Sequence, residues 1–154
     1  MKHLRLLSLL FLACTAVASA TDKSQTSTAV IAGPNARRKI VTLAEDVTAG
    51  KPGYLTTTGT AGLADANVLA KAVVKGYFES GGSTGQKVNL VTEDDQANLG
   101  ITNTIGDILI LSATAGGIAP PADAATGMYV TVLGVAKSST LVNFKPLASG
   151  AAIP

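Results

Sequence analysis

The stretch GDILILSATAGGI, residues 106–118, shows the fold class of this 154-residue chain most plainly. An apolar run over residues 108–111 is followed by small residues that end in Gly116 and Gly117. A short apolar run without alternation is typical of a strand covered on both faces, and glycine permits tight turns. The stretch therefore predicts a buried strand and a turn, with no reactive side chain beside them.

Similar runs recur along the chain, separated by Gly, Asp, Asn and Pro at spacings of about eight to twelve residues. They predict strands over residues 39–43, 53–58, 71–78, 86–92, 107–113, 128–136 and 139–144. We expect an all-β domain, a compact antiparallel β-sandwich or β-barrel of about seven short strands, preceded by an extended N-terminal arm. Residues 61–70 are interpreted as a loop with at most one or two helical turns.

Alternation in two of these segments predicts which side chains face the core. In residues 71–78 one face carries Ala72, Val74, Gly76 and Phe78, and the other carries Lys71, Val73, Lys75 and Tyr77. We expect the first set in the core and the second in solvent. By the same reasoning Val88 and Leu90 face the core, while Lys87 and Asn89 face solvent.

The first twenty residues have the pattern of a targeting segment. Lys2 and Arg5 are followed by an apolar run over 6–13 and then by Ala18-Ser19-Ala20. This pattern predicts a secretory signal peptide, cleaved before Thr21. The run is shorter than the roughly 20 apolar residues that cross a bilayer, so we expect no stable membrane span. An apolar segment buried in an assembly would have a similar sequence, and this alternative stays open.

Charge and residue types argue against several classes of function. The chain has 12 Lys and Arg against 10 Asp and Glu, and without Lys2 and Arg5 it is formally neutral. A neutral domain offers no basic face for nucleic acid. The single histidine, His3, and the single cysteine, Cys14, both precede Thr21, so the rest of the chain has neither residue for catalysis or zinc. We expect no enzymatic activity, catalytic residue, cofactor or metal. Lipidation of Cys14 stays open.

Two motifs resemble binding sites, but structural roles explain them better. Glu93-Asp94-Asp95 with Asp107 is the one acidic cluster, and it lacks the spacing and glycine of a calcium loop. We expect a hydrated turn there, after the strand 86–92. The glycine-rich residues 81–86 lack the lysine of a phosphate-binding loop and predict a hairpin loop. Gly134 is interpreted as a position where a side chain would not fit.

Four segments together resemble the small all-β domains of tailed-phage capsid decoration, cement and head-fibre proteins. They are TLAEDVTAGKPGYLTTTGTAGLADAN (42–67), AVVKGYFESGGSTGQKVNLVT (72–92), GDILILSATAGGIAPPADAATG (106–127) and VTVLGVAKSSTLVNFKP (130–146). The resemblance implies a non-enzymatic virion structural protein that stabilises a capsid surface. Its implied partners are the major capsid protein and further copies of itself, as a homo-oligomer that is often a trimer.

The N-terminal segment departs from this family, because phage head proteins assemble in the cytoplasm. A second interpretation therefore stays open, an exported bacterial surface or adhesin-like β module that binds a protein or a glycan. On the first interpretation the protein lies on the capsid surface. On the second it is periplasmic or extracellular after cleavage near Ala20.

We divide the chain into a leader (1–20), an arm (21–38), a β domain (39–146) and a C-terminal tail (147–154). The arm is small and polar, and its Gly33-Pro34-Asn35 predicts a turn.

Ordering the arm costs about 1 kcal/mol or more per residue, so we expect it to cross to a neighbouring subunit or the capsid shell. The residues expected to bind that partner are an apolar anchor and two arginines: Ala29, Val30, Ile31, Arg37 and Arg38. The alternative for the arginines is a solvated linker end.

Overall fold

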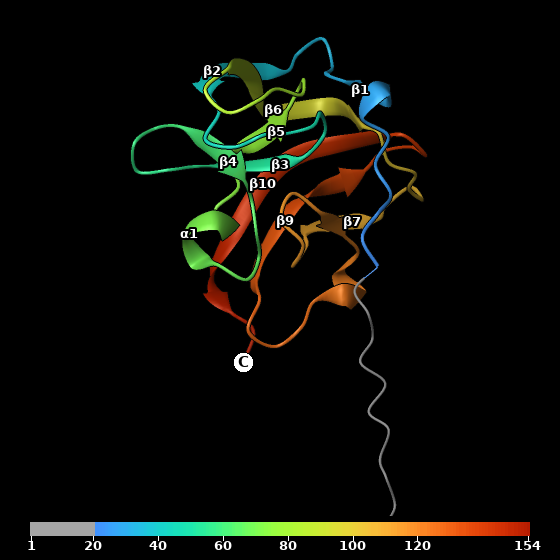
Figure 1. Ribbon diagram of the computed structural model, residues 1–154. Helices are drawn as coiled ribbons and strands as arrows, with labels where there is room; N and C mark the ends of the chain where they lie inside the picture. The colour runs from blue at the N-terminus through green and yellow to red at the C-terminus, as the bar shows by residue number, and fades with distance from the viewer. Residues whose placement is uncertain (1–20) are drawn as a thin grey trace, which may run out of the picture.

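The computed structural model describes residues 21–154, and these form a mostly β structure, as the sequence predicts (Figure 1). The strands are β1 (Val30–Ile31), β2 (Arg37–Thr42), β3 (Pro52–Leu55), β4 (Ala61–Leu63), β5 (Gly76–Phe78), β6 (Lys87–Leu99), β7 (Ile108–Leu111), β8 (Ile118–Ala119), β9 (Tyr129–Ala136) and β10 (Leu141–Ala152). The helical elements are η1 (Ser27–Ala29), α1 (Leu69–Ala72) and η2 (Pro121–Asp123). The leader, with its expected cleavage pattern and Cys14, lies outside the described residues.

The strands form one curled antiparallel sheet, a half-barrel, in the order β4-β3-β5-β6-β10-β9-β7-β8. Strand β6 lies in the middle of this order and belongs to both halves of the sheet. Its first half pairs with β2 and β5, and its second half pairs with β10 and β1. Register shifts against β2 and β10 place extra residues of β6 between Val91 and Ala97. Such bulges bend a strand, which fits the curl of the sheet here.

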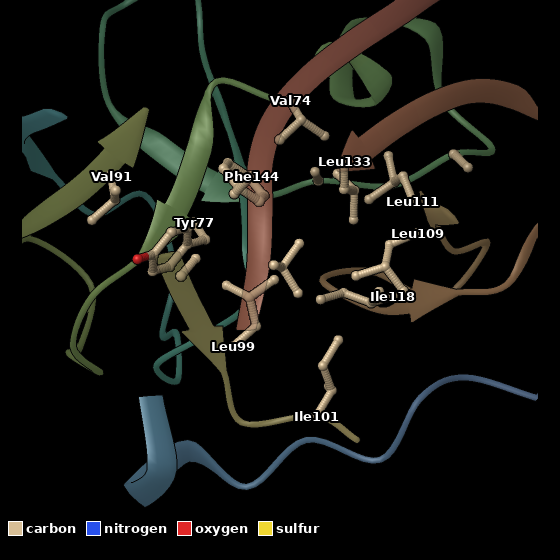
Figure 2. Packing of buried hydrophobic residues seen from close by; sticks show 14 of the residues in the cluster. Val74, Tyr77, Val91, Leu99, Ile101, Leu109, Leu111, Ile118, Leu133 and Phe144 are labelled. Carbon is tan, nitrogen blue, oxygen red and sulfur yellow. The ribbon is translucent and has the colours of Figure 1, made fainter. Parts of the chain in front are cut away.

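The core has two clusters, and strand β5 contributes to both. Tyr77 packs in the larger cluster and Phe78 in the smaller one, and both are fully buried. Figure 2 shows Tyr77 in the larger cluster beside Phe144. The expectation that Tyr77 faces solvent was therefore wrong. The expected strand 71–78 is broken by the helical turn α1, and the curled sheet covers both faces of the short strand that remains.

Several local predictions are confirmed. Val88 and Leu90 are buried, and residues 109–111 of β7 are buried as well. Residues 81–86 link the antiparallel strands β5 and β6, and the turn after β7 has a left-handed Gly116 with φ +69°. At Gly134 a Cβ would overlap the backbone carbonyl oxygen of Asn143, so only glycine allows β9 and β10 to approach this closely.

Several strands differ from the sequence prediction. Strands β1, β4 and β8 are additional short elements, β6 continues through 93–99, and β10 continues through most of the expected tail. Residues 93–95 therefore do not form a hydrated turn. In each case pairing with a neighbouring strand outweighs a local composition that is polar or rich in small residues.

Residues 21–36 of the arm fold back on their own domain. The Lys23 amide donates to the carbonyl of Ile118 in β8 (2.7 Å), the Thr26 amide donates to the Gly100 carbonyl (2.8 Å), and Val30 pairs with Leu99 in β6. In Figure 1 this blue segment runs down one side of the sheet from β1 past β7. Much of the arm (21–38) therefore packs against the sheet of the β domain (39–146). Sheet edges supply hydrogen-bond partners that offset the cost of ordering the arm.

Among the described residues, no helix has the length and apolar character needed to cross a membrane.

Candidate functional site

A buried carboxylate joins the arm to the sheet. Asp94 in β6 is 3% exposed, and its Oδ2 accepts hydrogen bonds from the Tyr77 hydroxyl and the Gly33 amide, both at 2.8 Å. Its Oδ1 accepts a third bond from the Gln96 amide at 3.0 Å. A buried charge requires such partners. The carboxylate therefore has a structural role, since its hydrogen-bond partners are groups of its own chain.

Tyr77 is held as a neutral donor. Burial raises the pKa of its hydroxyl far above the usual range, and the hydrogen bond to Asp94 raises this pKa further. The Tyr77 ring meets the Phe144 ring edge-on, with centroids 5.0 Å apart and an interplanar angle of 81°. A hydroxyl that stays protonated is unsuited to act as a general base at neutral pH.

A polar hollow of about 290 Å³ lies above this network, between the arm, β6 and β10. Its lining mixes both signs of charge: Asn35, Arg37, Glu93, Asp94, Asp95, Asn143, Phe144 and Lys145. The Glu93 carboxylate lies 3.5 Å from the Arg37 guanidinium, and the Asp94 carboxylate already accepts a hydrogen bond from the buried Tyr77 hydroxyl. Two of the three acidic side chains in this lining are therefore already paired with groups of their own chain.

The acidic cluster expected from the sequence does not assemble. Asp107 lies apart from residues 93–95 and pairs with the Lys23 ammonium at 3.1 Å. The Thr104 amide is the main cause that lowers the pKa of the Asp107 carboxyl, and Lys23 adds to the effect. Within residues 21–154 no three His, Cys, Asp or Glu side chains are arranged to hold a metal ion.

The five residues expected to bind a partner have different environments. Val30 packs against the larger core cluster, Ala29 is half-buried in η1, and Ile31 is 64% exposed. Arg37 pairs with Glu93. Arg38 donates from Nε to both carboxylate oxygens of Glu79, at 3.0 and 3.1 Å.

Both arginines therefore pair with acidic residues of their own chain. The Arg38 hydrogen bond is also the main cause that lowers the pKa of the Glu79 carboxyl. Of the five residues, Ile31 remains as an apolar side chain on the surface.

The outer face of β7, β9 and β10 carries an apolar surface that the sequence analysis did not identify. Directly opposed residues share a face of a sheet, and two rows of opposed residues cross these strands. We call the apolar members of these rows that reach solvent the outer band: Ile108, Val132, Val135 and Leu147. Ile108, Val135 and Leu147 are exposed, Leu147 to 73%, and Val132 is half-buried. The fifth apolar member of the rows, Ile110, is buried and is not part of the band.

A third row of opposed residues lies between these two rows and faces the core. Leu109, Gly134 and Phe144 are paired across the same strands, and all three are buried in the half-barrel. The outer band is thus the solvent side of a sheet whose inner side forms the core. Antiparallel sheets usually carry polar residues on that side, so an apolar outer side is informative. The alternation of β7 alone gives no such signal, because the whole strand is apolar.

The edge strand β2 offers a different kind of surface. Among the described residues its pairing partner is β6, and its residues 37–40 are exposed. Ile40 is 69% exposed, but Arg38 and Lys39 precede it. Charged residues on an edge strand are a common protection against unwanted pairing. We therefore assign this edge no binding role.

Comparison of the chain with known proteins identifies no family for it. No protein-family model matches the chain, and no curated protein matches it either.

Proposed function

We propose that this chain is a non-enzymatic structural protein of a tailed-phage virion, which decorates and stabilises the capsid surface. The outer band is the observation that supports this proposal most strongly. Exposed apolar side chains on the solvent side of neighbouring strands are typical of a surface that packs against another protein. The resemblance of residues 39–146 to capsid decoration domains points to the kind of partner.

The proposed contact places the outer band against the major capsid protein or against another copy of the chain. The arm and the Asp94 network stabilise the sheet through contacts within its own chain. A capsid presents many equivalent sites side by side, so contacts that are weak per copy become strong in sum. Burial of apolar side chains supplies the affinity.

The direct test is the composition of purified particles. Phage particles from cells that carry the gene are banded by density and analysed by mass spectrometry, with copies counted against the major capsid protein. We expect many copies per particle. Absence of the chain from the particles, with recovery in the envelope or the medium, would contradict the proposal.

A variant pair tests the outer band itself. Leu147→Ser removes an exposed apolar side chain from the band, while Ile40→Ser removes one of similar exposure from β2. We expect Leu147→Ser to weaken binding to particles that lack the chain by about tenfold, which corresponds to about 1.4 kcal/mol, and Ile40→Ser to leave binding unchanged. Urea unfolding of both variants checks that the fold persists. Equal binding by the two variants would exclude the band.

A second candidate function is an exported bacterial surface module that binds a protein or a glycan. The leader pattern, with Lys2, Arg5 and the apolar run before Ala18-Ser19-Ala20, is the observation that favours it. This candidate predicts that the chain fractionates with the envelope or the medium of cells that contain no phage. The particle analysis above therefore separates the two functions.

A further inference from the structure

The start of the arm contacts a residue that is distant in sequence. The backbone nitrogen of Thr21 lies 3.0 Å from Oδ2 of Asp123, the last residue of η2. We propose that the chain is cut between Ala20 and Thr21 by a signal peptidase, and that the Asp123 carboxylate then holds the new N-terminal amine of Thr21. The proposal concerns neither the outer band nor a partner, but cleavage by a signal peptidase accords with the second candidate function, the exported surface module.

The sequence supports the position of the cut, and the structure shows what holds the residues after it. Ala18 and Ala20 are the small residues that signal peptidases require at the third and first positions before the cut. Several contacts fasten the residues that follow this bond. Thr21 reaches Asp123, and Lys23 reaches Ile118 through its amide and Asp107 through its ammonium. A cut at this bond therefore leaves these fastening contacts in place.

The cut changes the chemistry of the Thr21 contact. Water adds across the peptide bond, so that its oxygen joins the Ala20 carbonyl carbon as the carbon–nitrogen bond breaks. At neutral pH the products are the Ala20 carboxylate and the Thr21 ammonium, and no other reactant is needed. A neutral N–H donor is thereby replaced by a charged one, and a charge-assisted hydrogen bond to a carboxylate is stronger. The new terminus is fixed beside strand β8.

The first experiment locates the cut. The full chain is produced in bacterial cells with an active export pathway, and its intact mass is measured together with those of Ala20→Asp and Ser19→Asp. We expect wild type and Ser19→Asp to begin at Thr21, because the middle position of the pattern tolerates any side chain. We expect Ala20→Asp to keep the leader. A wild-type chain that keeps residues 2–20, or begins elsewhere, would overturn the proposal.

The second experiment tests the contact with Asp123. An aminopeptidase can remove Thr21 only when the terminus detaches. We expect removal to be about threefold faster in mature Asp123→Asn than in wild type, and unchanged in the control Asp95→Asn, whose side chain is exposed. In wild type about 1 M salt should screen the pair and raise the rate toward that of the variant, a readout that needs no mutation. Equal rates in all proteins, with no effect of salt, would overturn the assigned role of Asp123.

Discussion

The hydroxyl of Tyr77 donates a hydrogen bond to Oδ2 of Asp94 over 2.8 Å, and the same oxygen accepts the amide of Gly33. One carboxylate oxygen thus connects β5, β6 and the turn at the end of the arm. The three segments are distant in sequence: Gly33 lies 61 positions before Asp94, and Tyr77 lies 17 positions before it. Among the described residues, Asp94 is the one buried side chain that carries a carboxyl group.

Loss of the carboxylate should cost more than loss of the hydroxyl. Tyr77→Phe removes one donor and leaves Asp94 with two, so we expect the free energy of unfolding to fall by about 1–2 kcal/mol. Asp94→Ala leaves both the hydroxyl and the Gly33 amide buried without a partner, and we expect a loss of about 3 kcal/mol or more. Urea unfolding measures both. Asp95→Ala is the control, with an expected change within about 0.5 kcal/mol. A similar loss in all three variants would contradict the network.

Substitution of Gly33 should destabilise the fold, because this glycine lies very close to Asp94. A Cβ at this position would lie 2.5 Å from Oδ1 of Asp94 and 3.0 Å from Cβ of Gln96. Gly33→Ala must therefore push the turn away from the carboxylate, and we expect a loss of about 1–3 kcal/mol in the free energy of unfolding. Hydrogen exchange should show the effect in the arm first, with faster exchange of the amides near Val30 than of those in β9. Unchanged exchange in the arm would contradict this close approach.

The ion pair between Arg38 and Glu79 should make stability depend on pH. The Arg38 hydrogen bond lowers the pKa of Glu79 below its usual 4.5 in the folded chain. The folded state then binds the proton less readily than the unfolded state, so the pair stabilises the fold above pH 4.5. This contribution is lost as the pH falls through the lowered pKa.

The variant Glu79→Gln isolates this contribution. We expect wild type to be more stable than Glu79→Gln at neutral pH, and the difference to shrink in urea titrations below pH 4.5. Glu93→Gln is the matched control, because its partner Arg37 is much more exposed than Arg38, and it should change stability less at neutral pH. A difference for Glu79→Gln that is constant with pH would contradict the pairing.

Local sequence patterns predicted the fold class and the short-range features. The glycine-separated apolar runs identified the β class, and the turn at Gly116 and the core positions Val88 and Leu90 followed from local rules. Features that depend on distant partners were not predictable in this way. Tyr77 lies on the face with the lysines by alternation, yet it is buried because the sheet curls over it.

The same reason explains the acidic residues and the outer band. Asp94 and its neighbours have the composition of a turn, but they form a strand because Gly33, Tyr77 and Arg37 supply partners from elsewhere in the chain. The outer band exists because strand pairing brings Ile108 opposite Val135, which are far apart in sequence. Neither arrangement follows from a periodicity of two within one strand.

Removal of the arm distinguishes the observed packing from an exchange between subunits. Deletion of residues 21–31 from the mature chain exposes the backbone groups of β8 and of the end of β6 that Lys23, Thr26 and Val30 now cover. Uncovered sheet edges pair with other chains, so we expect lower stability to urea and a larger mass by light scattering. An arm that instead crossed to a neighbour would give the opposite change in mass, because its removal would separate the subunits. Unchanged mass and stability would show that the arm contributes little to the fold, against the contacts described above.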